Sequence, residues 1–314
     1  MNPTVDEVTD IGYHHPRDPV ELWLARQWQD VIGFAIGIRE NFFAVGGNSL
    51  DAAVVINAVL QEFGVQLPLN VMTEHPTVEK LATRLRGQNE RLSHPLVRIQ
   101  RGDGTRPPLF LVHPANGQVG GYCHLAQELG EEFTLFGLQA TGLYSDADPL
   151  RTIPDLAKAY LDAVRVVRPT GPYLLGGCST GAAIAYEMAT QLARAGDEVP
   201  VLAVLDSELL EPLNAGFESW SDEPPLEQDL AEVLDTWKAR GLVPQDATPE
   251  FAARSLRVWQ ANQDAVRDWR PRPYSGPLDV FHGLSGDPTA GWPATARVHE
   301  HGRPVADALR EVIG

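Results

Sequence analysis

Hydrophobic positions in the first part of the chain recur with the spacing of amphipathic helices. A first face begins near Val20 and ends before Gly33, and it carries Leu22, Leu24, Ala25, Trp28, Val31 and Ile32. "SLDAAVVINAVLQEFG" and "PTVEKLATRLRG" predict two further helices, each closed by glycine. Residues 1–19 are polar and without a sustained period, so they are predicted to be a lead-in linker. The pattern therefore predicts a small helical domain over residues 20–87.

A different pattern begins after a polar, Gly- and Pro-rich stretch, residues 88–106, which is predicted to be a linker. Short apolar runs then alternate with longer helical segments over residues 107–314. The runs are "PLFLVH", "FTLFGL", "YLLGG", "VLAVLD", "LDVFH" and "TARVHEH". This alternation predicts an α/β domain with a mostly parallel sheet covered by helices.

One insertion, at about residues 210–272, interrupts that alternation with two successive helical patterns. The first shares a face formed by Leu226, Leu230, Val233, Leu234 and Trp237, and the second a face formed by Phe251, Val258, Trp259, Val266 and Trp269. A helical pair above the C-terminal edge of a sheet could be a lid. It could equally be two ordinary packing helices, and periodicity does not separate the two interpretations.

Composition and charge narrow the classes of molecule that the protein is expected to bind. The 314 residues are 43% hydrophobic and 21% charged, which is ordinary for a globular protein of two domains. The net charge of −17 disfavours nucleic acid and anionic membrane surfaces as partners. Two cysteines, Cys123 and Cys178, suit a reducing compartment, and neither a leader peptide nor a run of membrane-spanning length is present. We expect a cytoplasmic protein.

Ser49 follows two glycines at the start of the second predicted helix, where its hydroxyl could simply cap the helix. The surrounding "NFFAVGGNSL" and "LPLNVMTEHPTVEKLA", however, resemble the peptidyl carrier domains of nonribosomal peptide synthetases over residues 20–87. The resemblance implies that Ser49 carries covalent 4′-phosphopantetheine, added by a phosphopantetheinyl transferase. It also implies upstream condensation and adenylation domains as partners, and a carrier-bound peptidyl thioester as substrate.

Ser179 lies in "YLLGGCSTGAAIAYEMA", where an apolar strand leads into a Gly-x-Ser-x-Gly turn and a helix leads out. That is the context of a nucleophile elbow, in which flanking glycines leave room for a sharp turn. Cys178 is expected to pack away from the site. Asp206, at the end of "VLAVLD", is a candidate orienting acid because it follows the nucleophile in the chain order Ser, Asp, His of α/β-hydrolases.

The stretch "FLVHPANGQVGGYCHLAQEL" is similar to the oxyanion loop of thioesterase domains that end peptide synthetases, and the similarity extends over residues 95–290. It implies that the backbone N–H groups of Ala115 and Thr180 form an oxyanion hole. It also makes His113 a structural rather than a catalytic residue. The expected fold is a small all-α four-helix carrier bundle followed by an α/β-hydrolase with a helical lid insertion.

The catalytic base is harder to assign, because "GRPVADALREVIG" directly follows "ATARVHEH" and shortens the loop on which this family places its histidine. His301 is nearest the strand end and is the first candidate. His299 points to the same side of a strand and is the alternative, with His282 as a further possibility. Both strand histidines could instead be ordinary surface or packing residues. Without a nearby carboxylate or cysteine cluster, His-x-His is a poor metal signature, and no metal is expected.

The resulting hypothesis is an enzyme that releases a peptidyl or acyl chain from a carrier-bound thioester through an acyl-Ser179 intermediate, by hydrolysis or macrocyclisation. Asp206 would orient His301. Two alternatives keep the same folds. The second domain could be a catalytically impaired docking or holding module, or, if Met1 is a true start, the didomain could be a free-standing shuttle that moves acyl groups between carriers.

Overall fold

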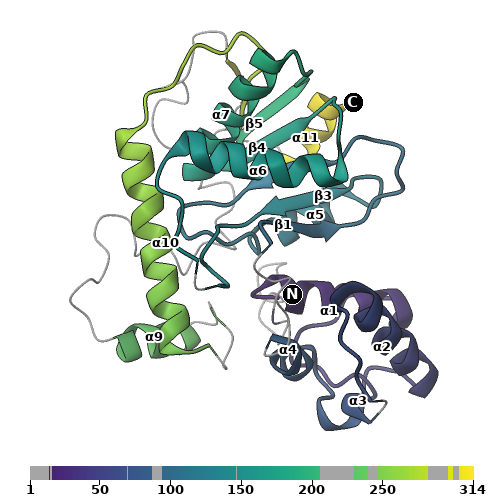
Figure 1. Ribbon diagram of the computed structural model, residues 1–314. Helices are drawn as coiled ribbons and strands as arrows, with labels where there is room; N and C mark the ends of the chain where they lie inside the picture. The colour runs from purple at the N-terminus through teal and green to yellow at the C-terminus, as the bar shows by residue number, and fades with distance from the viewer. Residues whose placement is uncertain are drawn as a thin grey trace, which may run out of the picture. The chain divides into compact units, whose positions relative to one another are not determined.

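The computed structural model describes residues 14, 16–68, 70–86, 94–145, 147–205, 230–239, 243, 247–281, 296–299 and 304–314. The chain divides into two compact units, one formed by residues 1–92 with 243–246 and the other by residues 93–242 with 247–314 (Figure 1). The first unit is helical and the second contains a sheet covered by helices, as the sequence predicts.

The first unit contains the helices α1 (Pro19–Ile32), α2 (Ser49–Phe63), α3 (Val71–Glu74) and α4 (Val78–Arg86). Gly33 and Gly64 end α1 and α2 in the left-handed conformation that glycine adopts without strain. The apolar faces meet in one core around Trp28 and Phe42, whose rings pack edge to face with centroids 4.8 Å apart.

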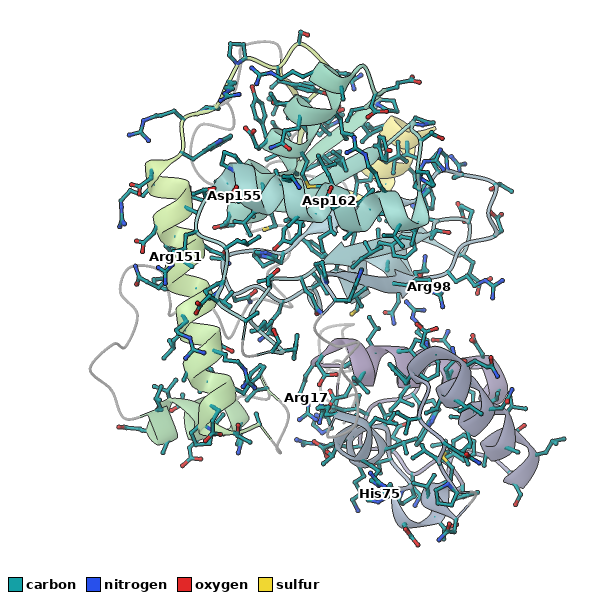
Figure 2. All side chains as sticks on the ribbon, in the orientation of Figure 1. Arg17, His75, Arg98, Arg151, Asp155 and Asp162 are labelled. Atoms are coloured by element: carbon teal, nitrogen blue, oxygen red, sulfur yellow. The ribbon has the colours of Figure 1, made fainter. Side chains whose placement is uncertain are left out.

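The ordered start of this unit lies further upstream than the sequence pattern predicts. Arg17 and Asp18 fall in the predicted lead-in linker, yet both are buried. Asp18 caps α1 by accepting hydrogen bonds from the N–H groups of Val20 and Glu21. Arg17 (labelled in Figure 2) and Arg86 both pair with the fully buried Glu21 carboxylate. The linker prediction is wrong here because Arg17 also pairs with Glu79, and Asp18 pairs with Arg86, and hydrophobic periodicity does not detect ion pairs between such distant positions.

The second unit contains a seven-stranded sheet in the order β1-β3-β2-β4-β5-β6-β7. The strands are β1 (Leu96–Gln100), β2 (Leu109–Val112), β3 (Leu135–Leu138), β4 (Leu174–Cys178), β5 (Val201–Leu205), β6 (Asp279–Phe281) and β7 (Arg297–His299). All neighbours pair in parallel except β1, which is antiparallel to β3. The strands β2, β4 and β5 are buried along their whole length, in keeping with their continuous apolar sequence.

Strand β1 corrects the predicted linker of residues 88–106. Leu96 pairs with Leu138 and Val97 with Gly137, which places this stretch at the edge of the sheet. Its alternation is weak because an edge strand is covered incompletely, and Arg98 in its middle is exposed (Figure 2). A strand with this composition resembles a polar connection when only the sequence is read.

Helices cover both faces of the sheet. The covering helices are α5 (Tyr122–Leu129), α6 (Ile153–Val167), α7 (Thr180–Ala195) and α11 (Val305–Ile313). The helices α6 and α7 pack together on one face, and α5 and α11 pack together on the other (Figure 1). No helix among the described residues is long and apolar enough to cross a membrane.

The predicted insertion contains the helices α9 (Leu230–Ala239) and α10 (Pro249–Asp268), and residues 206–229 lie outside the described residues. Figure 1 shows α10 as a long helix beside the sheet, with α9 packed against it. The C-terminal end of α10 enters the core through Ala265. Its middle contacts the loops after β2 and β3, where Val258 packs with Ala140 and Leu143.

The strand order reverses between β2 and β4, since β2 pairs with β3 on one side and with β4 on the other. Connections from these two strands leave in opposite directions, and the carboxyl ends of strands at such a switch point are where open α/β sheets bind their ligands. Val112 and Gly177 pair at that end. The loop after β2 and the turn after β4 carry the residues that the sequence singles out.

Candidate active site

Ser179 lies directly between the end of β4 and the first residue of α7. Its backbone has φ 53° and ψ −124°, and it is the non-glycine residue with positive φ in the described part of the chain. Such a conformation is costly for any residue with a Cβ and is held in place by the surrounding fold. Ser179 is exposed while its neighbours Cys178 and Thr180 are buried. The strand, turn and helix have the geometry expected of the nucleophile elbow that the sequence predicts.

The two glycines of the turn are required by close backbone approaches. A Cβ added to Gly177 would lie 2.3 Å from the carbonyl oxygen of Gly181. A Cβ on Gly181 would lie 2.3 Å from the carbonyl oxygen of Val112, at the end of β2. Because neither contact is possible for a real side chain, the elbow can sit directly against β2 only with glycine at both positions.

Thr180 provides the first N–H of α7, at the end of the helix where partial positive charge favours a developing oxyanion. Ala115 belongs to the turn after β2, in which the N–H of Gly117 donates to the carbonyl of Pro114 at 2.9 Å. Neither the Ala115 nor the Thr180 N–H donates a hydrogen bond to another described residue. Both groups are therefore available at the same end of the sheet as Ser179.

His113 is fully buried, and both nitrogens of its ring have partners. Nδ1 lies 2.7 Å from the carbonyl oxygen of Pro114, and Nε2 lies 2.6 Å from the hydroxyl oxygen of Tyr160. A carbonyl can only accept, so Nδ1 carries the hydrogen and Nε2 accepts from the Tyr160 hydroxyl. Burial lowers the pKa of His113 to about 4, so the ring is neutral near pH 7. This arrangement agrees with the structural role expected of His113.

Tyr122 connects the two strands at the site. Its hydroxyl donates to the carbonyl of Val112 at 2.6 Å and accepts from the N–H of Cys178 at 3.2 Å. Burial raises the pKa of Tyr122 well above its usual range, so the hydroxyl stays protonated. Sequence reasoning did not single out Tyr122 or Tyr160, because an aromatic residue on an apolar helix face looks like ordinary core.

Asn262 on α10 also reaches this loop, since its side-chain nitrogen donates to the carbonyl oxygen of Ala115 at 2.9 Å. The residue is 2% exposed. No sequence signal marks it, because the two residues that it connects are 147 positions apart in the chain.

The other two members of the predicted triad, Asp206 and His301, lie outside the described residues, as does His282. The residue before Asp206, Leu205, ends β5 and pairs with Cys178, the residue before Ser179. Cys178 itself is fully buried, in keeping with the packing role expected of it.

His299, the alternative base, is described, and its ring contacts residues of the neighbouring strand β6. It ends β7, three strands from β4 in the sheet order, which corresponds to about 14 Å at the usual strand spacing. Its Nε2 lies 2.8 Å from Oδ1 of the buried Asp279, at the beginning of β6. The ring stacks on Phe281 with centroids 4.6 Å apart. The His299 side chain is thus directed back along β6, away from the edge at which Ser179 lies.

Ser49 is the first residue of α2, and the structure removes the capping alternative for it. The cap is Asn48, whose Oδ1 accepts from the N–H groups of Leu50 and Asp51 at 2.8 and 3.2 Å. Asp51 completes a capping box by accepting from the Asn48 N–H. The exposed Ser49 hydroxyl makes no hydrogen bond to a described residue. It is free for modification, at a helix start that favours a phosphodiester.

Among the described residues, no three His, Cys, Asp or Glu side chains lie close enough together to hold a metal ion.

Comparison with known proteins decides the family. The thioesterase domain family matches residues 107–307, and the phosphopantetheine attachment site family matches residues 22–85. The chain belongs to the thioesterase domain family. Its first unit is a phosphopantetheine-binding carrier domain, which indicates covalently attached 4′-phosphopantetheine. Together the two units make up a carrier–thioesterase didomain of the kind that ends nonribosomal peptide synthetases.

Three similar proteins illustrate this. The didomain is 35% identical to the dimodular nonribosomal peptide synthase of Bacillus subtilis over 206 residues, which are 65% of this chain and 9% of that protein. It therefore spans a small part of this relative. The four-domain nonribosomal peptide synthetase holo-AB3403 shares its fold, with a TM-score of 0.79 at 24% identity over 97% of this chain and 26% of that one. The NocB thioesterase domain, solved as a covalent complex with a fluorophosphonate nocardicin G analogue, has a TM-score of 0.50 at 27% identity over 68% of this chain and 96% of that one.

Proposed function

We propose that the carrier–thioesterase didomain releases a peptidyl or acyl chain from the thioester that it carries on phosphopantetheine at Ser49, through an acyl-Ser179 intermediate. The observation that carries this proposal is the conformation of Ser179, an exposed serine at φ 53° between β4 and α7. A fold maintains such a backbone where the serine oxygen has to be presented to a substrate. The covalent fluorophosphonate complex of the related NocB domain is consistent with this role.

Bound phosphopantetheine supplies the thiol that holds the chain as a thioester. His301 would take the proton from the Ser179 hydroxyl, oriented by Asp206, which follows the β5 residue paired with Cys178. The Ser179 oxygen then bonds to the thioester carbon, and the N–H groups of Ala115 and Thr180 stabilise the negative oxygen that forms. When the C–S bond breaks, His301 returns the proton to the leaving sulfur. A second nucleophile, either water or an amine or hydroxyl of the chain itself, releases the product by the same steps.

Intact-mass analysis tests the proposal. A phosphopantetheinyl transferase loads an acyl-phosphopantetheine group onto Ser49, and the mass on the carrier and on Ser179 is followed over time. We expect the wild type to lose the acyl group from the carrier and Ser179→Ala to retain it. Equal loss from both proteins would contradict catalysis by Ser179. Retention by both would favour the docking or holding module instead.

A further inference from the structure

The oxyanion hole in the proposed mechanism depends on the orientation of one peptide group, the Pro114–Ala115 bond. In a trans peptide the C=O and N–H point in opposite directions. The Pro114 oxygen accepts two hydrogen bonds, from His113 Nδ1 at 2.7 Å and from the N–H of Gly117 at 2.9 Å. With the oxygen held on that side, the Ala115 N–H is held on the other. The contacts that orient the His113 ring therefore also orient the Ala115 N–H, the proposed oxyanion donor.

The ring of His113 is oriented by Tyr160 on α6, which lies beneath the loop. The Tyr160 hydroxyl is 2.6 Å from His113 Nε2, and the two rings meet edge to face with centroids 5.6 Å apart. Both residues are fully buried. Burial raises the pKa of Tyr160, so its hydroxyl stays protonated and donates to Nε2, the acceptor nitrogen of the His113 tautomer with hydrogen on Nδ1. That tautomer is the one able to donate to Pro114.

The next peptide group, Ala115–Asn116, is held by a residue of α10. Asn262 donates to the Ala115 carbonyl, and one helical turn earlier Val258 packs with Ala140 and Leu143 of the loop after β3. A Cβ on Gly117 would lie 2.7 Å from Cγ1 of Val258 and 2.7 Å from Cβ of Ala140. Gly117, at φ 80°, therefore lets α10 approach the loop closely enough for Asn262 to reach it.

We propose that His113, Tyr160 and Asn262 are positioning residues that hold Ala115 as an oxyanion donor, and that Asn262 makes this donor depend on the placement of α10. The catalytic consequence rests on the proposed function, whereas the hydrogen bonds do not depend on it. None of the three residues touches the reacting atoms. Because α10 belongs to the insertion, a shift of this helix would weaken the oxyanion hole without moving Ser179.

The first test compares Asn262→Leu with Gln260→Leu. Both replace an amide on α10 by an apolar side chain, but Gln260 donates to Asp264 on its own helix instead of to the loop. The readout is the second-order rate at which an alkyl fluorophosphonate labels Ser179, measured by intact mass from about pH 6 to about pH 9. We expect a fall of about tenfold to a hundredfold for Asn262→Leu, with the midpoint of the pH profile unchanged, and a change below about twofold for Gln260→Leu.

The outcomes separate the two proposals. Equal rates for Asn262→Leu and Gln260→Leu would overturn the positioning role. A shifted pH midpoint in Asn262→Leu would overturn it as well, because the change would then act through the base. If the wild type itself shows no Ser179 labelling, the proposed function fails, and the hydrogen-bond test below still decides whether the loop is held as described.

That second test uses Tyr160→Phe with Tyr173→Phe as its control, since the Tyr173 hydroxyl bonds the carbonyls of Arg168 and Pro169, outside the loop. Two-bond nitrogen–proton NMR correlations identify the His113 tautomer. We expect hydrogen on Nδ1 in all three proteins, because the Pro114 carbonyl still accepts from it, and a changed Nε2 chemical shift in Tyr160→Phe alone, because that nitrogen loses its donor. Hydrogen on Nε2 in the wild type would overturn the proposal, and so would an unchanged Nε2 chemical shift in Tyr160→Phe.

Discussion

His299 places its Nε2 2.8 Å from Oδ1 of Asp279, so this nitrogen is directed toward the beginning of β6 and not toward the edge of the sheet at which Ser179 lies. Asp279 is fully buried and also pairs with Arg297, so two cationic or donor groups satisfy a carboxylate that would be costly to leave alone. His299 is thus explained as a structural partner of Asp279. The base in the proposed mechanism is then His301, two residues further along.

The two histidines are expected to differ when each is replaced. His301→Ala should reduce acyl transfer to Ser179 by about a thousandfold or more, because the serine then lacks its base. His299→Ala should leave the transfer rate within about threefold and lower stability, because Asp279 loses a buried partner. Single-turnover intact-mass measurements give the rates, and urea unfolding gives the stability. Equal losses of activity in both variants would argue against this division of roles.

The strained backbone of Ser179 predicts an unusual order of stabilities. Glycine adopts φ 53°, ψ −124° without a Cβ clash, so Ser179→Gly should be more stable than Ser179→Ala by about 1–2 kcal/mol, even though glycine loses more chain entropy on folding. Both variants lack the nucleophile. The measurement is hydrogen exchange of the β4 and α7 amides with increasing urea. A more stable alanine variant would mean that the turn is relaxed.

Local sequence was sufficient to predict this elbow, because the strand, the turn glycines and the helix are contiguous and each glycine has a steric reason. The carrier helices were predictable for the same reason, since their apolar faces recur every turn. What could not be predicted depends on contacts between distant segments. Arg17 meets Glu79 in the folded unit, and Asn262 meets Ala115 across 147 positions.

The position of β1 at the edge of the sheet explains why the sequence predicts a linker at residues 88–106 instead of a strand. Strand β1 pairs on one side only, so Arg98 can point to solvent and the apolar pattern that marks central strands is incomplete. The residue that caps α2 could not be chosen from the sequence for a different reason. Asn48 and Ser49 are both good capping residues, and only the backbone shows that Asn48 has the extended conformation of a cap.

Because Asn48 caps α2 and Ser49 does not, substitutions at the two positions should affect helix stability and modification separately. Asn48→Ala should destabilise α2 by about 1 kcal/mol and still accept phosphopantetheine from a phosphopantetheinyl transferase. Ser49→Ala should keep the cap and its stability but gain no mass. Intact mass and hydrogen exchange of the α2 amides measure the two effects. Loss of modification in Asn48→Ala with α2 still folded would show that Asn48 contributes to recognition by the transferase.

The buried ion pairs at the start of the carrier domain should be essential to its stability. Arg17 and Arg86 share the Glu21 carboxylate, which is fully buried. Glu21→Ala leaves the buried Arg17 and the partly buried Arg86 guanidinium groups without this partner, and a loss of about 3–5 kcal/mol is expected. Lys158 and Asp162 on α6 form an exposed pair, so Asp162→Ala serves as the control and should change little. Hydrogen exchange of the α1 amides and of the α6 amides measures each effect in its own unit. A small effect of Glu21→Ala would mean that water replaces the lost carboxylate.

The neutral His113 ring makes the thioesterase domain sensitive to acid. Burial lowers the pKa of His113 in the folded state to about 4, below its usual value of 6.5. Below about pH 6.5 the unfolded chain therefore binds more protons than the folded one. The contribution of this residue is fully present above that pH and is lost as the pH falls toward 4, by about 3 kcal/mol in total.

His113→Asn removes this titration, so the comparison of its stability with that of the wild type isolates the contribution of His113 from those of the carboxylates. The wild type should lose stability more steeply than His113→Asn between about pH 6.5 and pH 4, and the two slopes should agree above about pH 7. Urea unfolding at a series of pH values, followed through hydrogen exchange of the β2 and α6 amides, gives both slopes. Parallel slopes across the whole range would mean that His113 is solvated in the folded state, and the orientation of the Pro114 carbonyl would then need another origin.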